Sequence, residues 1–202
     1  KSSPDLPSGN YSKQILFTTI TNRVPNKAKF ITGAGFIKEF NDVVTSATPV
    51  DYFKRSTTPP ANFATTRIVS AADSERPIYI WYNYAHKTVY WWSDADNVYA
   101  NEDASSMFNS LYINQLADLR GINFSKTKNM NSMFAVAKTG GCIKKVNFDG
   151  FDTSNVEDMS YMFASYAMST PENIEPIDFS NFNTSKVTNM QGMFSGSFFR
   201  SI

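Results

Sequence analysis

Hydrophobic residues recur at fixed spacings along the second half of the chain. The dipeptide Met-Phe occurs four times, in steps of 26, 29 and 31 residues, at positions 107–108, 133–134, 162–163 and 193–194. A further Met precedes the last three pairs by three residues, and other apolar positions recur eight, eleven and thirteen residues before that Met. Self-similarity at a nearly fixed period is the sequence signature of a repeat architecture. The pattern therefore predicts that each copy packs its apolar positions against those of the next copy.

Within one copy the hydrophobic period changes. Residues 177–179 (IDF) alternate between apolar and polar, as in a short strand with one buried face. Met190, Met193 and Phe194 follow at the spacing i, i+3, i+4, which is one face of a helix. Residues 183–186 (NTSK) lie between them and are of the types that form turns and begin helices. Each copy is thus predicted to be a strand, a turn, a short helix and a return loop. A series of such copies would stack its strands in parallel, and the Met and Phe ladder would be core packing, not a metal or cofactor site.

The first half of the chain has different patterns. Apolar residues at helical spacing predict helices at Ser12–Ile20 and Gly35–Val44, and Ala28–Thr32 is a candidate strand. The proline-containing stretch Thr45–Asn62 reads as a loop. Three stretches rich in β-forming residues follow, and a turn at Tyr84–Lys87 joins the last two into a hairpin; the stretches are Arg67–Ser70, Pro77–Tyr84 and Thr88–Ser93. We divide the chain into a linker (1–10), a small α+β module that caps the first repeat (11–103), and three to four repeats (104–202).

The repeat motifs FDTSNVEDMSYMF (151–163) and FNTSKVTNMQGMF (182–194), with the diverged LRGINFSKTKNMNSMF (119–134), resemble the BspA-like bacterial surface-protein repeat family, a relative of leucine-rich repeats. The resemblance extends over about 88–194. It implies an α/β fold: a short leucine-rich-repeat-like β/α solenoid with parallel stacked strands, preceded in the chain by the small α+β capping module. It also implies an exported or lipid-anchored protein of the bacterial cell surface. Members of the family are associated with adhesion and with binding host extracellular proteins, and they are not enzymes.

Composition and charge change this picture little. Apolar residues make up 42% of the chain and the net charge is +1, which argues against a nucleic-acid partner. Cys142 is the single cysteine, so no internal disulfide and no cysteine-based metal site is expected. His86 is the single histidine, and no nucleophile elbow, phosphate-binding loop or dinucleotide motif is present. No apolar stretch is long enough for a transmembrane helix. We therefore expect no enzyme activity, no cofactor and no bound metal.

Three functions are compatible with the sequence. The first is a surface adhesion module that binds a protein, such as host extracellular matrix or another surface protein, through the exposed strand positions of the repeats. The second is a structural spacer, or a segment that self-associates through the open C-terminal repeat. The third is carbohydrate binding by the Trp-rich hairpin, in which Trp91 and Trp92 must point to opposite faces. The candidate partner-binding residues are Asp118, Arg120, Lys145, Asn147, Asp149, Asp178, Trp91 and Trp92.

Overall fold

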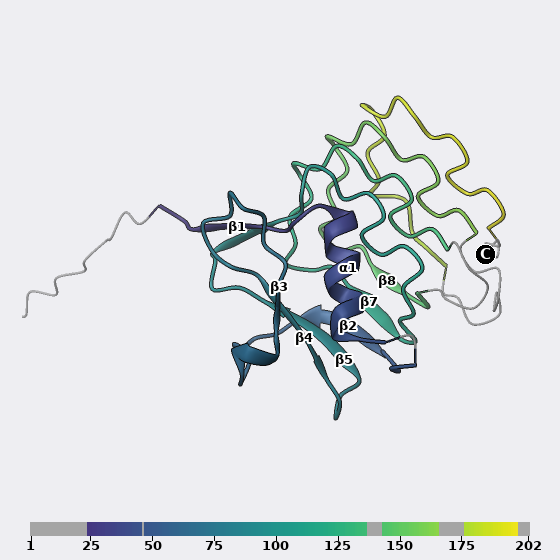
Figure 1. Ribbon diagram of the computed structural model, residues 1–202. Coiled ribbons are helices and arrows are strands. Elements are labelled where there is room, and N and C mark those ends of the chain that lie inside the picture. The colour runs from purple at the N-terminus through teal and green to yellow at the C-terminus, as the bar shows by residue number, and fades with distance from the viewer. Residues whose placement is uncertain (1–23, 46, 137–142, 166–175, 198–202) are drawn as a thin grey trace, which may run out of the picture.

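The computed structural model describes residues 24–45, 47–136, 143–165 and 176–197, and Figure 1 shows their arrangement. The linker at 1–10 and the helix predicted at Ser12–Ile20 lie outside these residues. The described part contains one α-helix, one 3₁₀ helix and eight strands. In chain order they are β1 (Lys27–Lys29), α1 (Gly33–Val43), β2 (Tyr52–Arg55), η1 (Phe63–Thr65), β3 (Arg67–Ile68), β4 (Tyr79–Asn83), β5 (Thr88–Trp92), β6 (Asn97–Tyr99), β7 (Leu116–Asp118) and β8 (Val146–Asn147).

Six of the strands form one mixed sheet in the order β3-β4-β5-β2-β7-β8. The β3-β4 and β4-β5 pairs are antiparallel, whereas β5-β2, β2-β7 and β7-β8 are parallel. Strand β2 is therefore inserted between a hairpin strand and the first strand of the repeats. Strands β1 and β6 pair in parallel as a separate two-stranded sheet.

Helix α1 packs on one face of the six-stranded sheet (Figure 1). It begins after Thr32, whose hydroxyl oxygen accepts a hydrogen bond from the Gly35 N–H at 3.3 Å, as an N-cap residue does. Phe36 and Phe40 lie one turn apart and are buried, and both rings contact Phe53 of β2 at centroid distances of 5.8 and 6.3 Å. Among the described residues, α1 thus covers one side of the sheet, and the opposite side is contacted only by the short 3₁₀ helix η1, at Tyr79 and Trp92.

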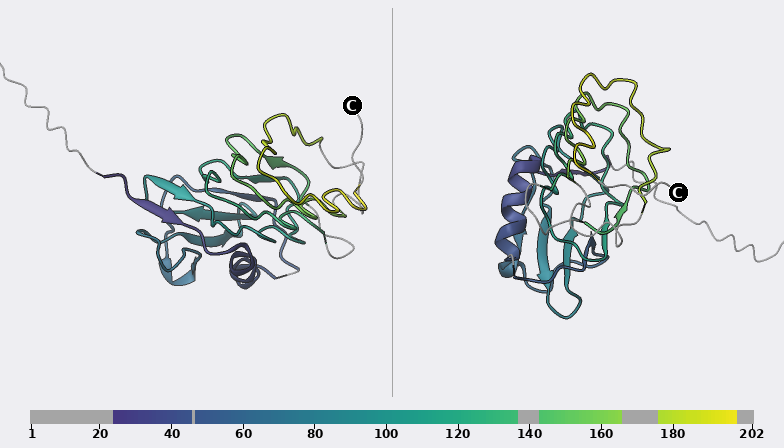
Figure 2. Two further views of the ribbon diagram at one scale, coloured as in Figure 1. Left: turned by 90° about the horizontal axis from the view of Figure 1, so that it is seen from above. Right: turned by 90° about the vertical axis from the view of Figure 1, so that its right-hand side faces the viewer.

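The four copies of the Met-Phe motif lie side by side, as the teal, green and yellow parts of Figure 2 show. We call residues 103–110, 129–136, 158–165 and 189–196 the Met-Phe segments. In each segment the N–H of the methionine of the Met-Phe pair donates to the carbonyl oxygen three residues earlier, at 3.2–3.3 Å. The residue just before that methionine has a positive φ of 54–59° in all four segments; these residues are Ser106, Ser132, Tyr161 and Gly192. A left-handed residue at this place makes a turn and not a helix.

Backbone hydrogen bonds connect each Met-Phe segment to the next. At each of the three junctions, four N–H groups of the earlier segment donate to four carbonyl oxygens of the later one at 2.8–2.9 Å. The phenylalanines of the Met-Phe pairs then stack in a column, with interplanar angles of 5°, 11° and 15°; they are Phe108, Phe134, Phe163 and Phe194. Backbone pairing and ring stacking therefore hold the segments in register.

The predicted fold class was wrong. The structure is not an α/β protein with a leucine-rich-repeat-like β/α solenoid of parallel stacked strands, because its main element is a mixed six-stranded sheet with a single α-helix. The short helices expected in the repeats are turns, because the left-handed residue breaks helical geometry while keeping the i, i+3, i+4 spacing of the apolar side chains. The strand expected at residues 177–179 is likewise not formed.

The N-terminal elements were predicted more accurately. The helix expected at Gly35–Val44 is confirmed as α1, and the hairpin turned at Tyr84–Lys87 is confirmed as β4 and β5. The loop expected over Thr45–Asn62 was wrong in part, because it contains β2.

Candidate binding site

The face of the six-stranded sheet opposite α1 presents aromatic and charged side chains. Along β2, Phe53 points to the helix and is buried, so the alternation of the strand places Lys54 on the other face. Lys54 pairs in register with Tyr90 of β5, and Tyr90 pairs with Trp81 of β4. These three side chains are only partly buried, and they form a row across three adjacent strands.

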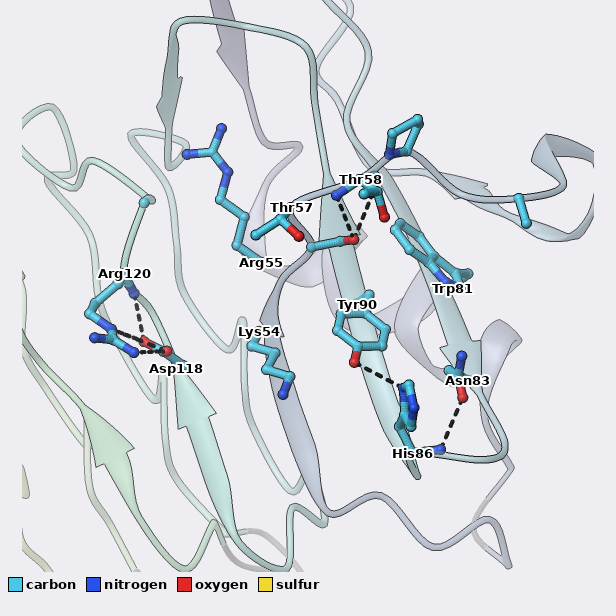
Figure 3. Close-up of a pocket in the computed structure, with 14 residues that line it drawn as sticks. Lys54, Arg55, Thr57, Thr58, Trp81, Asn83, His86, Tyr90, Asp118 and Arg120 are labelled. Carbon is cyan, nitrogen blue, oxygen red and sulfur yellow. Dashed lines mark hydrogen bonds and ion pairs between the residues drawn. The ribbon is translucent and has the colours of Figure 1, made fainter.

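The row is held together by ring contacts. The Trp81 and Tyr90 rings are nearly parallel, with an interplanar angle of 28° and centroids 5.7 Å apart. The ammonium of Lys54 lies 5.6 Å from the Tyr90 centroid and 5.1 Å from that of Tyr52, within the range of cation–π attraction. Figure 3 shows Lys54 and Tyr90 beside each other, with Trp81 on the far side of Tyr90. Two flat rings and a cation are thus presented at one surface.

An open groove of about 840 Å³ lies over this row. Trp81, Tyr90 and Lys54 line it, and the segment 56–59 forms one wall. This wall is attached to the sheet by the Ser56 N–H, which donates to the carbonyl of Trp91 at 2.8 Å. The Ser56 hydroxyl donates to the Thr58 carbonyl at 2.6 Å, and it accepts from the Thr58 N–H at 3.2 Å. The groove is within the size range of cavities that hold small ligands.

His86 lies at the end of the groove, in the hairpin turn (Figure 3). Its backbone N–H donates to the Asn83 side-chain oxygen at 2.9 Å, and its Nδ1 lies 3.2 Å from the Tyr90 hydroxyl. The single histidine of the chain is therefore engaged in positioning Tyr90.

Asp118 and Arg120 form an ion pair on the β7 side of the groove. The Arg120 Nε lies 2.9 and 3.1 Å from the two Asp118 carboxylate oxygens, and Arg120 Nη2 donates to Oδ2 at 2.7 Å. Burial acts to raise the pKa of the Asp118 carboxyl, but the hydrogen bonds and charge of Arg120 outweigh burial and hold that pKa below its ordinary value. The carboxylate is therefore charged and neutralised by its neighbour at physiological pH.

The groove has an excess of positive charge. Its lining includes the three cations Lys54, Arg55 and Arg120 but the single carboxylate Asp118. Arg55 follows Phe53 by two residues on β2, so its side chain leaves the sheet on the α1 side, where its guanidinium carbon lies 5.1 Å from the ring centroid of the buried Trp91. On the open face Arg120 is paired with Asp118, so Lys54 is the cation that favours an anionic ligand.

The residues expected at a binding site lie in different parts of the structure. Asp118 and Arg120 line the groove. Trp91 is fully buried, with its ring 5.7 Å from Phe30, so the expectation that its side chain binds a partner was wrong. Trp92 is half-buried on the open face, where it stacks on Tyr79 at 6.3 Å outside the groove.

The other expected residues lie on the repeats, away from the groove lining. The Asn147 side-chain oxygen accepts from the Asp149 N–H at 2.8 Å, and the Asp178 carboxylate accepts from the Ser180 N–H at 2.8 Å. Asp118 accepts from the Arg120 N–H in the same way at 3.2 Å. The hydrogen bond from the Ser180 N–H holds the pKa of the Asp178 carboxyl below its ordinary value. The polar residues at these positions thus form Asx turns, while Lys145 is an exposed neighbour.

Sequence reasoning missed Lys54 and the wall at 56–59. Both belong to the stretch that was interpreted as a loop, and the four-residue strand β2 gives a weak local signal. The pairing of β2 with β5 and β7 brings them to the groove, and such long-range pairing has no signature in a short window.

Within the ranges that the structure describes, no three His, Cys, Asp or Glu side chains are grouped so as to hold a metal ion. In those same ranges, α1 is too short and too polar to cross a lipid bilayer, and no longer helix is present.

Residues 102–200 match a protein family described as "Mycoplasma protein of unknown function, DUF285". The matched region contains the four Met-Phe segments and the groove residues Asp118 and Arg120, whereas Lys54, Trp81 and Tyr90 precede it. No curated protein and no solved structure matched the chain. The family description names no function and is compatible with a bacterial surface or exported protein.

Proposed function

We propose that this chain is a non-enzymatic interaction module of a bacterial cell surface, exported or lipid-anchored, that binds host or other extracellular proteins. The proposed contact surface is the open sheet face around the groove, not the strand positions of the repeats. The observation that supports this most directly is the row of Trp81, Tyr90 and Lys54, which no helix of the described residues covers.

The aromatic side chains on this face remain in contact with water unless a binding partner covers them. Trp and Tyr each bury a large area when they pack, and they are enriched among the residues that dominate binding energy. Here Trp81 and Tyr90 remain partly exposed next to Trp92, Tyr79 and Phe63, of which Phe63 is 49% exposed. Neighbouring aromatic side chains that remain exposed are typical of an interaction site.

The test is binding of the purified chain to immobilised fibronectin, laminin and collagen, measured by surface plasmon resonance. Trp81→Ala and Lys54→Gln change the groove. Tyr112→Ala and Lys38→Gln are matched controls outside the groove, since Tyr112 is 56% exposed and the Lys38 side chain is 77% exposed on α1. We expect binding to at least one of these proteins and a loss of at least about tenfold in affinity for the groove variants only, as for truncated interface anchors.

Absence of binding to all three proteins would contradict the adhesion role, and so would equal affinity of wild type and both groove variants. Circular dichroism of each variant shows whether it is folded. Export has a separate test: on intact cells of the native organism, an antibody against the chain should label the surface, and added protease should remove the label.

A second candidate function is a structural spacer that self-associates at the last Met-Phe segment. Met190 is 46% exposed and Phe194 42% exposed, whereas the equivalent residues of the earlier segments are buried. Light scattering over a hundredfold range of concentration tests this candidate, which predicts a rise in mean mass that Met190→Glu abolishes. A constant monomer mass would exclude it.

A further inference from the structure

The charge of the groove restricts the ligands that it suits. The Lys54 ammonium contacts two tyrosine rings, and no hydrogen bond or ion pair to it is found among the described residues. Its donors are therefore available to a ligand, unlike the Arg120 guanidinium, which Asp118 already engages. A carboxylate or sulfate on the ligand would form a charge-assisted hydrogen bond with Lys54, and such bonds are about twice as strong as neutral ones.

The rings beside this cation restrict the ligand further. Trp81 and Tyr90 stand side by side at the floor of the groove, next to polar groups of Asn83 and Thr57 at its margins. A pyranose ring combines an apolar face of C–H groups, which packs on aromatic rings, with a rim of hydroxyl groups, which hydrogen-bond to amides and hydroxyls. A few placed polar groups around an apolar platform are what orients a small ligand.

We infer that the groove binds an acidic glycan, a saccharide whose rings pack on Trp81 and Tyr90 and whose carboxylate or sulfate groups bind Lys54. This inference rests on the proposed function, and it identifies the glycan chains of extracellular proteins as the part that the module contacts. Repulsion from Asp118 is small, because Arg120 neutralises the carboxylate within the groove.

An acidic peptide is the main competitor for this groove. It would supply the same negative charge, but it usually binds as an added strand or by placing side chains into separate pockets. Strands β5 and β2 lie inside the sheet, and β3 pairs only with Tyr79 and Ile80 of β4, so a peptide strand could add only along the short free edge at 81–83. A strand at that edge would lie beside Trp81 but beyond Tyr90 and Lys54, which are on strands further inside the sheet. The open, ring-lined shape over all three residues therefore favours a saccharide.

The experiment is isothermal titration of the purified chain with four probes of defined length. A heparin octasaccharide has sulfate and carboxylate groups, a hyaluronan octasaccharide has carboxylate alone, a chitin hexasaccharide is neutral, and a glutamate octapeptide is acidic without sugar rings. We expect one or both acidic saccharides to bind at least about tenfold more tightly than the peptide and the neutral saccharide. A difference of this size corresponds to about 1.4 kcal/mol. Heparin binding without hyaluronan binding would identify sulfate as the recognised group, and binding of both would identify the carboxylate.

The variants test whether the groove is the site. Lys54→Gln retains the length of the side chain and removes its charge, and we expect it to weaken binding of the acidic saccharide at least about tenfold, with Lys38→Gln unchanged. Trp81→Ala should weaken it by a similar factor, with Tyr112→Ala unchanged. Because Trp81 is also part of the hairpin, Lys54→Gln decides the question if Trp81→Ala fails to fold.

Each contrary result is distinguishable. Equal binding of the glutamate peptide and the acidic saccharides would overturn the glycan assignment in favour of an acidic peptide. Failure of both acidic saccharides to bind, or binding that Lys54→Gln leaves unchanged, would also overturn it. If immobilised extracellular proteins still bound in a Lys54-dependent manner after enzymatic removal of their glycans, the proposed function would stand without the glycan. If neither glycans nor those proteins bound, both proposals would fail.

Discussion

The column of stacked phenylalanines allows the same substitution to be compared at equivalent positions with different burial. Phe163 is fully buried between Phe134 at 5.3 Å and Phe194 at 5.9 Å, and the edge of Phe179 lies 5.4 Å away. Phe194 occupies the same position in the last Met-Phe segment but is 42% exposed. We predict that Phe163→Ala destabilises the protein much more than Phe194→Ala.

The magnitudes follow from burial. Replacing a buried Phe by Ala costs about 3–5 kcal/mol, because transfer free energy is lost and a cavity remains. Phe163 loses two stacking partners as well, so we expect about 4 kcal/mol or more. Phe194 has little more than half of its side chain covered. Since full burial of such a side chain contributes about 1.5–3 kcal/mol, and removal here leaves no closed cavity, we expect about 1–2 kcal/mol for Phe194→Ala.

Urea denaturation measures both free energies of unfolding. Far-UV circular dichroism follows the whole fold, and tryptophan emission follows β4 and β5, which contain all three tryptophans. Coincidence of the two transitions would support two-state unfolding and permit the comparison. If Phe194→Ala cost as much as Phe163→Ala, or if Phe163→Ala cost less than about 1.5 kcal/mol, the ring column would not be the core of the repeats.

Three further substitutions test other features. Gly33→Ala should cost about 1–3 kcal/mol by urea denaturation, because the added Cβ would lie 2.1 Å from the Ser105 carbonyl oxygen and force α1 from the first Met-Phe segment; unchanged stability would refute this close approach. Ser132→Val should lower the free energy of unfolding by about 1–3 kcal/mol, because a β-branched residue is strained at the φ of 55°. Ser132→Gly should leave the protein about as stable as wild type, and equal stability of the two variants would contradict the left-handed turn. Burial acts to raise the pKa of the Asp158 carboxyl, but hydrogen bonds from Ser160 outweigh it and lower that pKa. The stability that the Asp158 carboxylate contributes is therefore present above the unfolded-state pKa of about 3.9 and is lost as the pH falls through the lower folded-state pKa. Asp158→Asn, scanned by melting temperature between pH 6 and pH 2, should lose less stability in acid than wild type, and parallel curves would be the contrary result.

The sequence predicted elements whose signal is local. Phe36 and Phe40 are one helical turn apart, and the alternating aromatic stretches on either side of Tyr84–Lys87 form the hairpin as expected. In the repeats, the expected strand is formed in two copies as β7 and β8, which pair in parallel, but the expected short helices are not formed, because a turn with a left-handed residue reproduces the i, i+3, i+4 spacing of a helix. Gly192 was the one signal of a left-handed residue at that position, and Ser106, Ser132 and Tyr161 gave none.

The candidate site was predicted less completely than the fold elements. Alternation requires Trp91 and Trp92 to point to opposite faces, but it does not say which face a helix covers. Helix α1, from a separate part of the chain, decides that Trp91 is buried. The groove likewise depends on β2, which lies between β5 and β7 only because of pairings across 30 residues or more of sequence. Long-range pairing thus positions the site, and short sequence windows do not record it.

The junctions between Met-Phe segments set a rule for how such a chain can change in length. Every junction uses the same four backbone positions, so removing one whole unit would leave each remaining amide opposite a carbonyl of the same kind. Removing residues within a Met-Phe segment would shift side chains from the interior to solvent and break the register of its junctions. The stretches between the segments differ in length, since the copies are 26, 29 and 31 residues apart, and all three junctions are nevertheless formed. Natural variants that carry this motif should therefore keep each Met-Phe segment intact and change in length between segments or by whole units, while the groove, which is built from β2, β4, β5 and the first strand of the repeats, is unaffected by how many units follow.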